Sequence, residues 1–347
     1  MSAVTSTSAS AFRWGLVQVS LSGVLWGTAG LASELLNDAT GAHPLVLGAW
    51  RAAGAAVILL VILVALRQLR PAIDLLRRHP LTVVGAGICT GLYQTLYFQG
   101  VAWAGVTVAT VVSLGIGPVV ATVVEAIAQR RRPSWLSLGV VAVALTGLLL
   151  AASAGGHGAG GTRPVEGVLI SAAAGIAFGS ATLIGRAPAQ HAAALPLTTV
   201  TTTVSAFPAS LLALIPVATQ GAAVVPAQTA GQWGGIIYLA AGTMALAYLS
   251  LYAGLKHVPG SAALVATLLE PVTAAFAAFV LLGERIGATG WIGTALILFA
   301  VVGLSFEAPP ADEEDPVRER LPDPAGEERV PVATGPIPRA DGDPLGG

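Results

Sequence analysis

A glutamate followed by a proline lies in the middle of a long apolar segment, residues 262–293 (AALVATLLEPVTAAFAAFVLLGERIGATGWIG). A transmembrane helix needs about 20 apolar residues, and an ionisable group at its centre costs about 2.5 kcal/mol or more unless it meets a partner or water. Glu270 is therefore a candidate to bind a substrate amine or to carry a proton. The alternative is a protonated carboxyl group that is hydrogen-bonded to a neighbouring helix.

Two prolines lie at the middle of apolar runs. Pro271 follows Glu270, and Pro118 occupies the corresponding place in residues 106–127. Each proline frees a carbonyl group one turn back and weakens its helix at mid-membrane, which suits a hinge or gate that lines a polar cavity. Because membrane helices tolerate proline, a purely structural role is the alternative.

A set of aromatic and amide side chains also lies near the centres of apolar runs, too far from the membrane surfaces to form an interfacial belt. These predicted substrate-binding residues are Trp26, Tyr93, Gln94, Tyr97, Phe178, Tyr248 and Tyr252. A cavity lined by such rings would hold a small apolar or amphipathic solute and orient it through hydroxyl and amide groups. For each residue taken singly, helix packing is the alternative.

Two further charged residues lie within apolar runs. Arg51 is predicted either to attract a substrate carboxylate or to pair with Glu34 or Asp38 at the end of the preceding run. Glu125 lies beside the basic stretch at 130–132, so an interfacial ion pair is the favoured interpretation there.

The composition identifies an integral membrane protein. Hydrophobic residues make up 54% of the chain and charged residues only 10%, and the mean hydropathy of +0.77 is far from that of soluble domains. Ten apolar runs are separated by polar or Gly/Pro-containing breaks. They cover residues 14–33, 44–66, 81–102, 106–127, 135–154, 167–184, 197–218, 233–255, 261–282 and 288–306.

The short loops differ in charge. Most Lys and Arg residues fall in loops on one side of the expected bundle, whereas the other side has only Arg163 and Arg285. The positive-inside rule therefore places both chain termini in the cytoplasm. From residue 307 onward the composition changes to Pro, Asp, Glu and Arg, which is typical of a disordered tail.

The two halves of the membrane region repeat each other. The sequence GVLWGTA at 23–29 recurs as GIAFGSA at 175–181, and YFQG at 97–100 resembles LYAG at 251–254. Five helices per repeat is an odd number, so the second copy must be inserted upside down, as in many secondary transporters. Gly117 stands where the second repeat has Glu270, which makes any carboxylate chemistry asymmetric.

The paired segments, the LxEP-type ninth run ending in LLGERI and the WG(T/S)A-type first and sixth runs resemble the two EamA repeats of the drug/metabolite transporter superfamily. The resemblance implies a ten-helix, all-α carrier of the inner membrane, often an exporter of amino acids or similar metabolites, driven by a gradient and not by ATP. The expected organisation is a cytoplasmic N-terminal tail at 1–13, a first repeat at 14–154, a Gly-rich extracytoplasmic loop at 155–166, a second repeat at 167–306 and a disordered cytoplasmic tail at 307–347.

Other chemistries are disfavoured. All five histidines lie at helix ends or in loops, which leaves no intramembrane metal site, and neither a phosphate-binding loop nor a Gly-x-Ser-x-Gly motif is present. We therefore expect no enzymatic activity and no cofactor, with coupling to a proton gradient through Glu270 as a hypothesis. The expected partners are a small-molecule substrate and the lipid bilayer, without nucleic acid, and no oligomeric state follows. The rival interpretations are a membrane scaffold or receptor subunit and a lipid-modifying enzyme.

Overall fold

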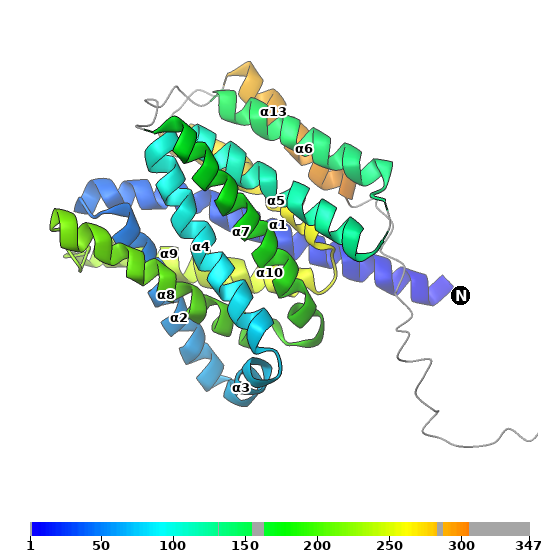
Figure 1. The fold of residues 1–347 in the computed structure, drawn as a ribbon, viewed down its shortest axis with the longest axis horizontal. Helices are drawn as coiled ribbons and strands as arrows, with labels where there is room; N and C mark the ends of the chain where they lie inside the picture. Colours follow the sequence, from blue (N-terminus) through cyan, green and yellow to red (C-terminus); the bar gives the residue numbers. More distant parts are fainter. Residues whose placement is uncertain (1, 131, 155–162, 283–286, 305–347) are drawn as a thin grey trace, which may run out of the picture. The chain divides into compact units, whose positions relative to one another are not determined.

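The computed structural model describes residues 2–130, 132–154, 163–282 and 287–304 (Figure 1). Within these ranges the chain forms helices joined by short turns and contains no strand. Most of the predicted Gly-rich loop at 155–166 and all of the predicted tail at 307–347 lie outside the described residues, as do Arg131 and Glu284.

The helices of the first half end near the breaks that the sequence predicted. One further helix, α3, was not predicted. Their bounds are α1 Ser2–Thr40, α2 Pro44–Ala65, α3 Leu69–Arg78, α4 Pro80–Ala104, α5 Val106–Ala128 and α6 Trp135–Ala154. α3 is a short amphipathic helix in a stretch that was expected to be a basic loop. α1 starts at Ser2, so the residues expected to form an N-terminal tail at 1–13 are helical from Ser2 onward. The physical reason is that this Ser/Thr/Ala-rich stretch has no Gly or Pro to stop a helix that the apolar run has already nucleated.

The second half contains two membrane segments that are not regular α-helices throughout. Its elements are α7 Pro164–His191, α8 Ala194–Gln220, α9 Ala230–Ala240, the π-helix η1 Ala241–Leu246, α10 Ala247–Leu255, α11 Gly260–Ala266, α12 Leu269–Ala277, the π-helix η2 Ala278–Leu282 and α13 Ala288–Leu304. α9, η1 and α10 together form one span, and α11, α12 and η2 form another.

The described residues thus contain nine segments that are long and apolar enough to cross a membrane, and the shorter apolar α13 supplies a tenth. This confirms the predicted all-α fold with ten transmembrane helices in two five-helix repeats. We call the end of the bundle where α1 ends and α2 begins the α1–α2 end, and the opposite end, where α2 ends and α3 begins, the α2–α3 end. α6 lies side by side with α13, and α4 with α7 (Figure 1).

The segment formed by α11 and α12 is interrupted between Thr267 and Leu268. Pro271 has no N–H to give to the carbonyl group of Thr267, and that carbonyl accepts the N–H of Glu270 instead, at 2.9 Å. The interruption therefore lies one turn before Pro271, where the sequence predicted a weakened helix. Pro118 behaves differently, because α5 continues through it from Val106 to Ala128.

Glycines bring α1 into backbone contact with this interruption. A Cβ atom on Gly23 would lie 2.9 Å from the carbonyl oxygen of Thr267, and one on Gly27 would collide with the carbonyl oxygen of Glu270. Small residues spaced four apart let membrane helices approach this closely. The backbone of Glu270 is thereby held against α1.

The repeated sequence in α7 makes the same kind of contact with α5. A Cβ atom on Gly175 would lie 2.5 Å from the carbonyl oxygen of Ser113, and one on Gly179 would lie 3.1 Å from the carbonyl oxygen of Gly117. Gly117 and Glu270 therefore occupy equivalent positions, each with its carbonyl group against a glycine of the other repeat, as the sequence repeat predicted.

We predict that Gly27→Ala lowers thermal stability, because the added methyl group has no space against the backbone of Glu270. Overpacking of this kind costs about 1 to 3 kcal/mol. The measurement is the unfolding midpoint of the purified protein in detergent. Gly30, on the same helix, has no atom within 4 Å of the place where a Cβ would lie, so Gly30→Ala is the matched control and should leave the midpoint unchanged. Equal midpoints for Gly27→Ala and wild type would contradict the close contact.

Candidate functional site

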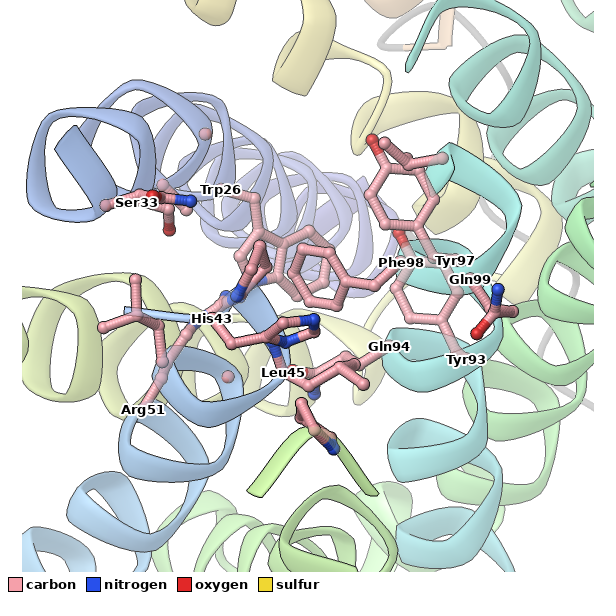
Figure 2. A pocket seen from close by; sticks show the side chains of 18 of the residues that line it. Trp26, Ser33, His43, Leu45, Arg51, Tyr93, Gln94, Tyr97, Phe98 and Gln99 are labelled. Atoms are coloured by element: carbon pink, nitrogen blue, oxygen red, sulfur yellow. The ribbon is translucent and has the colours of Figure 1, made fainter. Parts of the chain in front are cut away.

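A cavity of about 750 Å³ is lined by residues of the α1–α2 end, such as Asn37 and His43, and by Glu270. Figure 2 shows His43, Trp26 and Arg51 around it. Its walls come from α1, α2, α4, α8 and α10, and Glu270 of α12 is the acidic residue among its described lining residues. Most of the predicted substrate-binding residues line it, namely Trp26, Arg51, Tyr93, Gln94, Tyr97, Tyr248 and Glu270. The structure thus gathers residues from both repeats around one cavity, and their role in substrate binding stays a prediction.

Aromatic rings form one wall of the cavity. Tyr93 stacks on Phe178 with ring centroids 4.6 Å apart, and Trp26 contacts Phe178 at 5.8 Å and Tyr248 at 5.0 Å. Phe178 does not itself line the cavity but supports Tyr93 and Trp26 from α7. The four rings come from four different helices, so the wall depends on the packing of both repeats. Edge-to-face and stacked pairs of this kind contribute about 0.5 to 1.5 kcal/mol each beyond the burial of their area.

Arg51 reaches from α2 to the π-helix η1. Its Nη2 donates a hydrogen bond of 2.9 Å to the carbonyl oxygen of Thr243, while its Nε is buried and has no hydrogen-bond partner among the described residues. A π-helix takes carbonyl groups out of the regular α-helical ladder, which leaves that of Thr243 able to accept from the guanidinium group. The hydrogen bond goes to this carbonyl and not to Asp38, which is exposed. The side chain of Glu34, the other partner that the sequence offered, lies outside the described residues.

Glu270 lies at the start of α12, just after the interruption, and is half-buried in the cavity. Its carboxylate is within electrostatic range of the Arg51 guanidinium and of the Tyr93 and Tyr248 rings. No described residue donates a hydrogen bond to this carboxylate. The cavity therefore holds one positive and one negative group that face the same space, with free hydrogen-bonding capacity on both.

Two further polar side chains of the cavity, Gln94 and Tyr97, are held by neighbours. The amide nitrogen of Gln94 lies 3.7 Å from the sulfur of Met244, and Gln94 also interacts with the hydroxyl of Tyr248. The Tyr97 hydroxyl forms a hydrogen bond of 2.8 Å with the Thr110 hydroxyl. Trp26 is different, because its indole N–H is buried without a partner among the described residues. Such fixed polar groups among rings can orient an amphipathic solute.

Tyr252, like Phe178, does not line the cavity. It is 1% exposed and packs against Gly185 of α7, with its hydroxyl near Thr90 and Thr201. α10 runs toward the α2–α3 end, so Tyr252 lies one turn deeper than Tyr248, below the floor of the cavity. Its position is that of a core residue, which was the alternative interpretation for each aromatic residue.

Sequence reasoning missed the residues at the mouth of the cavity. These are residues at helix ends, among them Asn37, His43, Phe98, Gln99, Pro216 and Gln220. His43 caps α2 by accepting the N–H of Leu45 at Nδ1, and burial lowers the pKa of its imidazole, which favours the neutral form that can accept. The pair His43-Pro44 is a helix-start signal in the sequence, because proline is favoured at the first helical position.

The comparisons with known proteins agree on the class of fold. A family model described as the EamA-like transporter family matches residues 13–153 and 165–306. The chain is 29% identical over 290 residues to the "Uncharacterized transporter YwfM" of Bacillus subtilis (strain 168), which covers 83% of this chain and 92% of that protein. It also resembles a solved structure described as "Crystal structure of protein", with a TM-score of 0.68 and 21% identity over 85% of this chain and 97% of that one.

We predict energetic coupling between Arg51 and Glu270. Arg51→Gln and Glu270→Gln each remove one of two opposite charges that line the same cavity, so each should leave the other charge uncompensated. The double variant should lose less stability than the two single variants lose in sum, and the difference, the coupling free energy, should be about 0.5 to 3 kcal/mol. The measurement is the unfolding midpoint in detergent.

The matched control for this cycle is Arg186→Gln. Arg186 is also a partly buried arginine in a membrane segment, but its Nε donates to the carbonyl oxygen of Val258 at the α2–α3 end. Arg186→Gln and Glu270→Gln should therefore be additive. Additivity of Arg51→Gln and Glu270→Gln would mean that the two groups do not interact across the cavity.

Proposed function

Because the chain belongs to the EamA-like transporter family, we propose that this membrane transporter carries a small organic metabolite across the cytoplasmic membrane by alternating access, as an exporter. The observation that supports the proposal most strongly is the presence of both Arg51 and Glu270 in one aromatic-lined cavity. The cavity ends in the middle of the bundle, between the two repeats, which is where secondary transporters with inverted repeats bind substrate.

The proposed substrate is a small amphipathic solute, an amino acid or a similar or drug-like compound. A carboxylate would accept from Arg51, a cationic amine would face Glu270, and an apolar body would lie against Trp26, Tyr93 and Tyr248. A solute with all three features uses each free group of the cavity. A solute without charge would leave Arg51 and Glu270 desolvated without gain.

Alternating access is supported by the contrast between the two ends of the bundle. The cavity reaches the α1–α2 end, whereas Glu125 closes a contact between the repeats at the α2–α3 end. Its carboxylate accepts the backbone N–H groups of Gly260 and Ser261, at 2.6 and 3.3 Å, and the Ser261 hydroxyl at 2.5 Å. This contact takes the place of the ion pair with the basic stretch that the sequence favoured, and it joins α5 of the first repeat to α11 of the second.

The proposed orientation has both termini in the cytoplasm, on the evidence of the Lys and Arg residues in the short loops. The α2–α3 end is then cytoplasmic, and the cavity opens to the outside. An exporter releases its substrate from this state and reloads when the contact made by Glu125 opens. Pro271, beside the interruption, is the proposed hinge, and Pro118 the corresponding weak point of α5.

Glu270 is also the proposed coupling group. It is the carboxylate that faces the cavity among the described lining residues, so protonation there would change the charge seen by a bound amine. Carboxyl groups inside membrane segments commonly form proton relays in transporters. A single cavity carboxylate also fits a carrier better than a hydrolase, which needs paired catalytic groups.

We predict saturable flux of one solute class in proteoliposomes, with uptake and efflux measured for a labelled panel of amino acids and other metabolites. A pH gradient should alter the flux of wild type, and Glu270→Gln should remove that effect. Glu166→Gln, which changes an exposed acid at the start of α7, is the matched control and should behave as wild type.

Absence of flux for every member of the panel, with the protein folded and inserted, would argue for a scaffold or receptor role. Flux that is independent of pH in wild type and unaltered in Glu270→Gln would retain the carrier but remove the proton coupling. Flux of uncharged solutes alone would remove the proposed roles of Arg51 and Glu270.

We predict that Glu125→Ala shifts the conformational equilibrium toward a state open at the α2–α3 end. Hydrogen bonds to a charged group contribute about 1.5 to 3 kcal/mol each, so the loss of one such bond changes the ratio of the two states about ten-fold or more. In a Cys89→Ala background, which removes the single native cysteine, thiol labelling of Ala263→Cys in α11 should rise and labelling of Ser33→Cys at the mouth of the cavity should fall.

Ala263 is buried, and Ser33 lines the cavity. These two reporters therefore change in opposite directions if the contact made by Glu125 holds one end closed. Glu166→Ala is the control and should leave both labelling rates unchanged. If Glu125→Ala left both rates as in wild type, Glu125 would have only a local structural role.

A further inference from the structure

α3 differs from the other helices because it is short and strongly amphipathic. It starts immediately after a tight turn in which Arg67 adopts a left-handed conformation, with φ 56°. The N–H of Arg67 donates to the carbonyl oxygen of Val64, and the N–H of Gln68 donates to that of Leu63. This hydrogen-bonding pattern is a Schellman motif, which ends α2 abruptly and lets the chain change direction.

The surface of α3 divides into three faces. Ala72 and Leu75 are buried, at 4% and 8% exposure, against α8 and α4. A second face carries Leu69, Ile73 and Leu76, spaced i, i+4 and i+7, which are 44%, 40% and 39% exposed. The exposed leucines and isoleucine contact no part of the described protein that would cover them.

The third face is basic. Arg70, Arg77 and Arg78 lie at i, i+7 and i+8 and are all exposed, and Asp74 on the same face offsets one of the three charges. Arg67 adds an exposed positive charge at the preceding turn. An exposed apolar face directly beside a basic face is the pattern of a helix that lies in the membrane interface, with its apolar side in the acyl region and its cations among the headgroups.

We propose that α3 binds anionic phospholipid headgroups of the membrane through Arg70, Arg77 and Arg78, with Leu69, Ile73 and Leu76 inserted beside them. Each arginine near an anionic leaflet contributes electrostatic attraction that salt screens, and the planar guanidinium group matches phosphate oxygens in a bidentate manner. The buried face fixes α3 to α8 and α4, so lipid bound there stabilises the folded bundle. This site is independent of substrate, direction and coupling ion.

The basic stretch at the end of α5 provides an internal comparison. Arg130 also follows a helix in a left-handed conformation, with φ 50°, and Arg132 is exposed. The chain then reaches α6 at Trp135 without an intervening amphipathic helix. These arginines therefore match those of α3 in the sign of their charge and in their place at the α2–α3 end, but they do not lie on an amphipathic helix.

The test is the thermal unfolding of the full chain in detergent after addition of phosphatidylglycerol or phosphatidylcholine. Wild type should gain several degrees more from phosphatidylglycerol than from phosphatidylcholine, and the difference should shrink at high salt. Arg70→Gln/Arg77→Gln/Arg78→Gln should lose the difference. The matched variant Arg130→Gln/Arg132→Gln should keep it, and Arg70→Lys/Arg77→Lys/Arg78→Lys should recover most of it.

Several outcomes would overturn the proposal. One is equal stabilisation of wild type by the two lipids, and another is a full phosphatidylglycerol effect in the triple glutamine variant. Loss of the effect in Arg130→Gln/Arg132→Gln would show attraction spread over all the basic loops, without a site on α3. If the glutamine variant did not fold, failure of the triple lysine variant to respond to phosphatidylglycerol would equally count against the site.

Discussion

The close contact between α1 and the interrupted ninth membrane segment determines the position of the Glu270 carboxylate within the membrane region. An interruption of a membrane helix is costly where it faces lipid, because the bilayer core offers no hydrogen-bond partners to irregular backbone. Gly23 and Gly27 allow α1 to cover the carbonyl groups of Thr267 and Glu270. The interruption is therefore enclosed by protein on this side, and the Glu270 carboxylate is held at one depth in the cavity. The aromatic wall is built around the same contact, since Trp26 lies between Gly23 and Gly27 on α1.

The two repeats share this contact but use it differently. Glycines of α7, in the second repeat, cover Ser113 and Gly117 of the first repeat, and α5 remains continuous through Pro118. In the second repeat the corresponding segment is interrupted and carries an acid. The glycine contacts that the two repeats share thus set how the helices cross. The features that differ between the repeats are Glu270, the interruption before Pro271 and the π-helix η1, whose Thr243 carbonyl accepts from Arg51. The polar chemistry is concentrated where the second copy differs from the first.

Much of this frame follows from the sequence because it depends on local composition and on repetition. The apolar runs, the matched GVLWGTA and GIAFGSA segments and the unusual Glu270 could all be identified without coordinates. The residues that line the cavity could not be identified in this way, because lining depends on a residue's depth in the membrane as much as on the helix face that carries it. Tyr248 and Tyr252 lie one turn apart on the same face, yet the first lines the cavity and the second is enclosed below it. The π-helix η1 and the turn into α3 also depend on tertiary contacts, which no single segment encodes.

Glu125 and Glu270 show how hydrogen bonding separates structural from functional roles. Glu125 is a helix residue whose carboxylate accepts three hydrogen bonds from Gly260 and Ser261, so its acceptor capacity is used within the protein. Glu270 receives no hydrogen bond from a described residue and faces Arg51, whose Nε is likewise free of described partners. Under the proposed function, the aromatic wall accepts many apolar bodies, and this pair of opposite charges selects among them. Specificity would then depend on the spacing of the two charges, which the contact of α1 with the interruption and the hydrogen bond of Arg51 to η1 jointly determine.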